Sequence, residues 1–189
     1  VALVGENGAG KSTLLKVLGG DYQPDSGEYL IDGAHRHFRQ PREAIEAGVS
    51  IIYQERQVVP FLSVAENIFM EGIPAGPMRL IDFKALNQMA QAIIDEFRLP
   101  FHATDRVRDL SVAHQQMIEI MKAYRRNPKI IAFDEPTASL SDAEIETLFK
   151  IIGQLREKGI IILYVSHRMK EIFQITDEVV ILKDGKFVG

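Results

Sequence analysis

A glycine-rich segment at the start of the chain constrains the fold more than any other feature. Residues 1–13 read VALVGENGAGKST, where an apolar run leads directly into the pattern G-x-x-x-x-G-K-[ST] at residues 5–12. Gly5, Gly8 and Gly10 let the backbone turn with positive φ and approach a ligand closely. Successive N–H groups, together with the start of a helix at residues 11–18, would form a cradle for an anion. A tight turn before an ordinary helix is the alternative, but it requires neither a lysine nor hydroxyls here.

The polar residues of this segment suit a bound phosphate chain. We expect the Lys11 ammonium to lie on the β- and γ-phosphates, and the Ser12 hydroxyl to bind Mg²⁺ as a hard oxygen ligand. Glu6 carries the wrong charge for an anion site, so its side chain should point away from the phosphates. The residues predicted to bind the ligand are Asn7, Gly8, Ala9, Gly10, Lys11, Ser12 and Thr13.

A second motif, at residues 130–135, is an apolar strand that ends in two carboxylates. Open α/β sheets bind ligands at the carboxyl ends of their strands. We expect Asp134 to hold Mg²⁺ directly or through water, and Glu135 to act as a general base on a water beyond the γ-phosphate. Two solvated acids at a strand exit are the alternative, which the glycine-rich segment upstream disfavours.

Short apolar runs alternate with helical patterns along the chain, which indicates an α/β fold with a mostly parallel sheet. The expected strands are residues 1–4, 29–31, 49–53, 130–133, 160–165 and 179–182. Between residues 63 and 127 only helical patterns occur, the best at 83–97 and 112–126, with a break at Pro74, Gly76 and Pro77. Another helix is expected at 142–158. We therefore expect a helical subdomain inserted into an α/β core.

Composition narrows the possible functions. The chain has 189 residues, a net charge of −4 and no cysteine, which excludes disulfides and thiolate metal sites and gives no indication of a nucleic-acid partner. The longest apolar run, residues 160–165, is far too short to span a membrane. Because the chain starts with a valine in a strand pattern, we expect further residues upstream.

Taken together, the motifs resemble the nucleotide-binding domain of ABC (ATP-binding cassette) ATPases over essentially the whole chain. Residues 5–12 are similar to Walker A, and residues 130–135 to Walker B with its catalytic glutamate. Gln54 matches the Q-loop glutamine, and His167 matches the switch histidine. Residues 110–114, LSVAH, stand in the place of the LSGGQ signature, and residues 134–141 run through the D-loop.

The resemblance implies a P-loop NTPase that binds and hydrolyses ATP with Mg²⁺. It implies a RecA-like α/β core at residues 1–58 and 127–189, and a helical subdomain carrying the signature at about residues 59–126. The implied catalytic residues are Glu135, His167, Gln54 and Lys11, and the implied metal-site residues are Ser12, Gln54 and Asp134. In the family two cassettes pack head to tail, so Ser111 and Ala113 would bind the ATP held by the opposite cassette.

Finer features resemble one branch of the family. The segments at residues 51–69, 115–124 and 164–185 are similar to the ATP-binding subunits of bacterial sugar importers of the ribose, galactose and arabinose type. This implies a second cassette in the same or a fused chain, transmembrane permease subunits and, indirectly, a periplasmic or extracellular solute-binding protein. It also implies a monosaccharide substrate and a peripheral location on the cytoplasmic face of the membrane.

The sequence departs from the family pattern in two places. Val112, Ala113 and His114 replace the usual Gly-Gly-Gln of the signature, and Ser141 replaces the D-loop aspartate. Alanine is tolerated if its φ is negative, and Ser111 would then cap a helix. The alternatives are a catalytically weak, regulatory half of a cassette pair and an ABC ATPase outside transport. The family's adenine-stacking aromatic lies upstream, so we expect this segment to bind the base more weakly than a longer one.

Overall fold

The predicted apolar strands assemble into a six-stranded sheet with the order β4-β5-β6-β1-β7-β8 in the computed structural model. Its strands are β1 (Ala2–Gly5), β4 (Val49–Ile52), β5 (Ile130–Asp134), β6 (Ile161–Val165), β7 (Val179–Lys183) and β8 (Lys186–Phe187). All neighbouring pairs are parallel except β7 and β8. Parallel strands place their carboxyl ends at one edge, so the segments that follow β1, β4, β5 and β6 meet there. The expected α/β fold with a mostly parallel sheet is confirmed.

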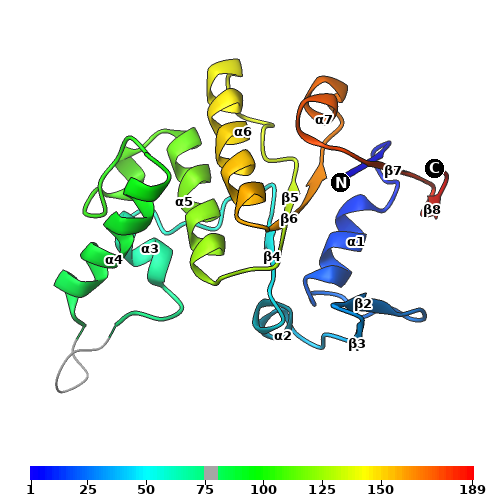
Figure 1. Cartoon of the computed structure of the whole chain (residues 1–189), viewed down its shortest axis with the longest axis horizontal. Coiled ribbons are helices and arrows are strands. Elements are labelled where there is room, and N and C mark those ends of the chain that lie inside the picture. Colours follow the sequence, from blue (N-terminus) through cyan, green and yellow to red (C-terminus); the bar gives the residue numbers. More distant parts are fainter. Residues whose placement is uncertain (75–80) are drawn as a thin grey trace. The chain divides into compact units, whose positions relative to one another are not determined.

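Strand β2 (Tyr29–Ile31) was expected from its apolar run, but it does not join this sheet. It pairs with β3 (Ala34–Arg36) in an antiparallel hairpin, drawn in blue in Figure 1. Asp32 and Gly33, at the turn, have φ values of 54° and 73°. Positive φ at both central residues is typical of a type I′ turn, for which Asp-Gly is a strong signal. The polar, exposed sequence of β3 explains why its strand pattern was missed.

Helices α1 (Lys11–Leu18), α2 (Pro41–Glu46) and α7 (Met169–Ile175) belong to the same unit as the sheet. The helix predicted at 11–18 is confirmed. Leu15 of α1 is fully buried in a cluster with Leu3 of β1, Ala132 of β5 and Val165 of β6. This apolar packing fixes the first turn of α1 relative to the strand ends.

The helical patterns of the middle segment form a second unit. Its helices are α3 (Val64–Phe69), α4 (Phe83–Glu96), the short 3₁₀ helix η2 (Val107–Asp109) and α5 (Val112–Arg125). Helix α3 packs on α4 and on α5, and Val64 and Ile68 of α3 have no exposed surface. These three helices are shown from cyan to green in Figure 1. Leu86 and Ile118 complete this apolar interior from the two longer helices.

The structure describes residues 1–74 and 81–189, which divide into two units. The first contains Val1–Gln54, Asn127–Ala138 and Leu155–Gly189, and the second contains Glu55–Arg126 and Ser139–Gln154. The second unit thus includes most of helix α6 (Asp142–Glu157), which the sequence interpretation assigned to the core. Gly76 and Pro77, where a chain break was predicted, lie outside the described residues. Within the described residues, no helix combines the length and apolarity that crossing a membrane requires.

Candidate functional site

The glycine-rich segment forms a turn between β1 and α1 that depends on its glycines in two different ways. Gly8 and Gly10 have φ values of 84° and 99°, a region that side chains disfavour. Gly5 was expected to have a positive φ as well, and this is wrong, because it is not among the glycines with positive φ. It is required for space instead: a Cβ on Gly5 would collide with the carbonyl oxygen of Leu182 on β7. The shape of the turn therefore relies on the neighbouring strand.

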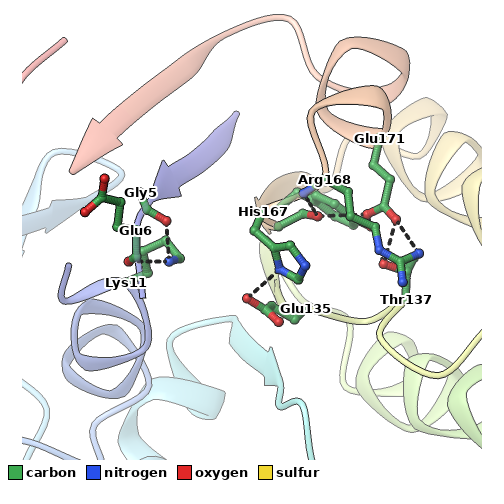
Figure 2. A network of polar contacts seen from close by, with 10 residues as sticks. Gly5, Glu6, Lys11, Glu135, Thr137, His167, Arg168 and Glu171 are labelled. Carbon is green, nitrogen blue, oxygen red and sulfur yellow. Dashed lines mark hydrogen bonds and ion pairs between the residues drawn. The ribbon is translucent and has the colours of Figure 1, made fainter. Parts of the chain in front are cut away.

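Backbone hydrogen bonds hold the turn from inside and from outside. The Ala9 N–H donates to the Glu6 carbonyl at 3.1 Å, and the Gly185 N–H donates to the Ala9 carbonyl at 3.1 Å. The Lys11 ammonium donates to the carbonyls of Gly5 at 2.8 Å and Glu6 at 3.1 Å, as Figure 2 shows. These contacts use two of its three N–H donors. The Glu6 side chain is exposed and turned away from this ammonium.

A pocket of about 380 Å³ opens beside this turn. Its volume is in the range of small-molecule sites, roughly 300–1,000 Å³. The residues that line it are Asn7, Gly8, Gly10, Lys11, Ser12, Thr13, Gln54, Asp134 and Glu135. The structure therefore brings together residues from the turn, from the end of β5 and from the segment after β4. Ala9 does not line the pocket, because its side chain is buried under the turn.

Asp134 ends strand β5 and is only 7% exposed. Burial raises the pKa of its carboxyl group, and the neighbouring Glu135 adds to the rise, while a hydrogen bond from Ser12 and the charge of Lys11 oppose it. The Ser12 hydroxyl and the Asp134 carboxylate thus lie within hydrogen-bonding distance of each other. A hydroxyl and a carboxylate side by side are hard oxygen donors, a set that fits Mg²⁺.

Glu135 and His167 lie at the ends of adjacent parallel strands, β5 and β6. Glu135 has a φ of 48°, and its N–H donates to the Val165 carbonyl at 3.0 Å. His167 Nδ1 is 3.2 Å from Glu135 Oε1, a contact drawn in Figure 2. An ionised carboxylate only accepts, so Nδ1 is the donor of this pair whenever the Glu135 carboxylate is ionised. The strained backbone of Glu135 turns its carboxylate toward both the pocket and His167.

The predicted signature residues lie in the second unit, outside the pocket lining. Ser111 is the N-cap of α5, and its side chain accepts the His114 N–H at 3.3 Å. Ala113 lies in the first turn of α5, is 2% exposed and is not among the residues with positive φ. An alanine is tolerated here because its φ is not positive, and its backbone carries no strain of the kind that requires glycine.

The sequence interpretation missed the residues that support the glycine-rich turn. Leu182 and Gly185 come from the hairpin of β7 and β8, far along the chain. Asp184 and Gly185 form its turn with φ values of 50° and 74°. The Asp-Gly pair after an apolar run was a signal for this hairpin. No local pattern indicated that the hairpin would contact residues 5–9.

Comparison with known proteins identifies the family. Residues 1–138 match the ABC transporter family. The chain is 50% identical over 188 residues to "Ribose import ATP-binding protein RbsA 2" of Escherichia coli O157:H7. The aligned region covers 100% of this chain and 37% of that protein. It is 51% identical over 187 residues to "Arabinose import ATP-binding protein AraG" of Mannheimia succiniciproducens, and the aligned region covers 99% of this chain and 37% of that protein. The chain thus spans little more than a third of these relatives.

Solved structures agree on the fold. The ADP conformation of MJ1267, an ATP-binding cassette of an ABC transporter, superposes with a TM-score of 0.86 at 24% identity, covering 100% of this chain and 78% of that one. A dimeric post-hydrolysis state of the ATP-binding cassette MJ0796, bound to ADP and Pi, gives a TM-score of 0.79 at 24% identity, covering 98% and 82%. With the family match over residues 1–138 and the relatives at about half identity, the chain belongs to the ABC transporter family.

Proposed function

We propose that this chain binds ATP with Mg²⁺ and hydrolyses it to power an ABC importer of a monosaccharide. One observation carries the proposal: Lys11, Ser12, Asp134 and Glu135 line a single pocket beside a glycine-rich turn. Such a pocket provides donors for phosphates, hard oxygen ligands and a general base together. The names of the ribose and arabinose import relatives support the transport role and the class of sugar.

In this proposal the turn binds the phosphates. The N–H groups of residues 7–13 and the Lys11 ammonium hold the β- and γ-phosphate oxygens, because the glycines at 8 and 10 leave the backbone uncovered. Ser12, Asp134 and Gln54 are the residues that would hold Mg²⁺. The ion would supply charge neutralisation on the β- and γ-phosphates. The hydrogen bond between Ser12 and Asp134 keeps these two oxygens close to each other.

Glu135 and His167 carry out the chemical step in this proposal. Glu135 accepts a proton from the attacking water, and Gln54, which lines the same pocket, orients that water. Nδ1 of His167 contacts Glu135 at 3.2 Å, so a contact with the γ-phosphate would be donated by Nε2, with hydrogens on both ring nitrogens. The pair therefore connects the base to the phosphoryl group that the water attacks, and ADP is the leaving group.

We infer that the working site is shared by two cassettes. Ser111 and Ala113 would bind the γ-phosphate held by a second cassette, because the N-terminal end of α5 presents N–H groups and a positive dipole. The other proposed partners are transmembrane permease subunits and a periplasmic or extracellular solute-binding protein, with this chain peripheral on the cytoplasmic face of the membrane. No nucleic-acid partner is proposed, since the net charge is −4.

The test uses the complete polypeptide assembled with its permease in proteoliposomes. Glu135→Gln keeps the size of the side chain but removes the base, so ATP turnover should fall by about 10²–10⁴-fold while ATP binding is kept. Uptake of labelled ribose or arabinose into the same vesicles should fall in parallel. Asp95→Asn, an exposed change on α4, is the matched control. Turnover that is unchanged in Glu135→Gln would overturn the catalytic assignment.

A second candidate is a regulatory cassette that binds ATP but contributes little hydrolysis. The observation that favours it is the altered signature at Val112, Ala113 and His114. In that case Lys11→Ala would abolish binding and alter transport, whereas Glu135→Gln would leave turnover within about twofold of the parent. ATP hydrolysis that does not depend on any transported sugar would instead favour an ABC ATPase outside transport.

A further inference from the structure

A buried carboxylate lies outside the pocket lining. Glu171, in the first turn of α7, is 5% exposed. It accepts hydrogen bonds from three hydroxyls, those of Thr137 at 2.8 and 2.9 Å, Tyr164 at 2.9 Å and Ser166 at 2.9 Å. Arg168 Nη1 lies 3.4 Å from the same carboxylate. The donors come from two segments of the chain, one at Thr137 and one at residues 164–168.

The donor set suits a side chain with two acceptor oxygens. Each hydroxyl has one hydrogen, and Thr137, Tyr164 and Ser166 each direct it at a Glu171 oxygen. Burial and the adjacent Glu171 raise the pKa of the Tyr164 phenol, so that tyrosine stays a donor. A neutral amide at residue 171 would replace one acceptor oxygen by an NH₂ donor. At least one hydroxyl would then lose its buried acceptor, which is costly.

Two of the three hydroxyls belong to the loops that carry Glu135 and His167, and Tyr164 lies on strand β6. Thr137 follows Glu135 by two residues, and Ser166 directly precedes His167. The Ser166 hydroxyl also accepts the Arg168 N–H at 3.0 Å, which closes the loop around His167. In Figure 2, Glu171 and Thr137 lie to the right of Glu135 and His167. One carboxylate therefore accepts a hydrogen bond from a hydroxyl in each of the two loops.

We propose that Glu171 is a positioning residue that sets the separation of Glu135 and His167 by anchoring Thr137 and Ser166. This inference rests on the proposed ATPase function. The glycine-rich turn is not part of the anchor, so ATP binding should be independent of it. Displacement of a reacting group by about 1 Å is enough to lower a rate by roughly 10²-fold. The signature of this role is a lower kcat with an unchanged affinity for ATP.

The experiment compares Glu171→Gln with Glu157→Gln, an exposed change on α6, in the complete protein with its permease. We expect Glu171→Gln to lower kcat by about tenfold or more and to leave the KM and the Kd for ATP within about twofold. Glu157→Gln should match the parent in each value. Thermal unfolding of each variant shows whether the fold is kept.

A second pair of variants tests the anchor without changing the carboxylate. Thr137→Ser keeps the hydroxyl and should keep kcat within about threefold, whereas Thr137→Val keeps the shape but loses the donor and should lower kcat by about fivefold or more. The double variant Thr137→Val with Glu171→Gln should have a kcat no lower than that of the slower single variant, because both substitutions remove the same contact.

The outcomes separate the two proposals. If the parent protein does not hydrolyse ATP, the proposed function fails. If the parent is active and kcat is unchanged in a folded Glu171→Gln variant, the positioning role is overturned. If Glu171→Gln does not fold, Thr137→Val decides, and an unchanged kcat there overturns the role as well. A rise in the KM and Kd for ATP with an unchanged kcat would also contradict it.

Discussion

At the scale of single residues, the turn that binds phosphate in our proposal depends on Gly5 for space. A Cβ at this position would collide with the Leu182 carbonyl oxygen, which belongs to backbone that is paired in the sheet. We expect Gly5→Ala to lower the free energy of unfolding by about 1–3 kcal/mol and to weaken ATP binding, because β1 must move away from β7. Chemical denaturation and equilibrium binding measure the two effects.

Gly153 provides the matched control for that substitution. It lies inside helix α6, its φ is not positive, and a Cβ added there meets nothing within 4 Å. Gly153→Ala should therefore stabilise the protein by about 0.5–1 kcal/mol, since alanine favours helix over glycine. Equal effects of the two changes in denaturation would contradict the role given to Leu182.

Glu119, also at the residue scale, makes the stability of the second unit depend on pH. It is 7% exposed and accepts the Gln57 N–H, and burial raises its pKa from 4.5 to about 6, against the pull of this bond and of Lys122 and Arg56. A carboxyl whose pKa is higher in the folded state contributes stability below pH 4.5 that is lost as the pH rises past 6. The 1.5-unit difference corresponds to about 2 kcal/mol.

Glu119→Gln tests this dependence, because the amide oxygen still accepts the Gln57 N–H but does not titrate. As the pH rises from 4.5 to 7, we expect the free energy of unfolding of the variant to increase by about 2 kcal/mol relative to that of the parent. Urea denaturation at both values measures the difference. Glu157→Gln, exposed on α6, should show no such change. A difference in the free energy of unfolding between the parent and Glu119→Gln that is the same at both pH values would refute the prediction.

At the scale of elements, the N-cap of α5 distinguishes a structural serine from a functional one. Ser111 caps α5, and Ser63 caps α3 in a full capping box with Glu66. Removing either hydroxyl by Ser→Ala should cost about 1 kcal/mol of stability, because a helix amide loses its acceptor. If Ser111 also binds phosphate for a second cassette, only Ser111→Ala should slow ATP turnover of the complete protein as well. Equal ATP turnover in the Ser111→Ala and Ser63→Ala variants would mean that Ser111 acts only as a helix cap.

Elements were predictable from the sequence where local chemistry decides them. Helix α1 and strand β2 have the predicted bounds, and α4, α5 and α6 end within one residue of them, because apolar periodicity and caps are local. The short strands β3 and β8 were missed, since hairpin pairing of exposed residues stabilises them and no apolar run marks them. The six-residue helix α2 was missed too, because so short a segment carries little periodicity.

The candidate site was predictable to a different extent. Lys11, Ser12, Asp134 and Gln54 were selected from motifs, and the structure places all of them at one pocket. Leu182, Gly185 and Glu171 were not selected, because each acts on a segment that is distant in the chain. Such supports are fixed by the strand order β5-β6-β1-β7, which periodicity alone does not determine.

At the scale of the whole molecule, the proposed function assigns Lys11 and Glu135 to separate steps at one site. Lys11 holds the phosphates, and Glu135 acts only on the attacking water, so the two substitutions should affect the complete protein differently. With a second cassette present, Lys11→Ala should remove about half of the ATP bound at saturation, whereas Glu135→Gln should remove none. Equilibrium dialysis with labelled ATP measures this directly.

Turnover completes the test at this scale. If both cassettes must close on ATP together, Lys11→Ala should also lower hydrolysis by far more than the half expected for two independent sites. The double variant Lys11→Ala with Glu135→Gln should then bind as little ATP as Lys11→Ala and turn over as slowly as the slower single variant, since both changes affect one site. A loss of only half the turnover would mean that the cassettes work independently, and it would remove the reason for assigning Ser111 and Ala113 to a partner's ATP.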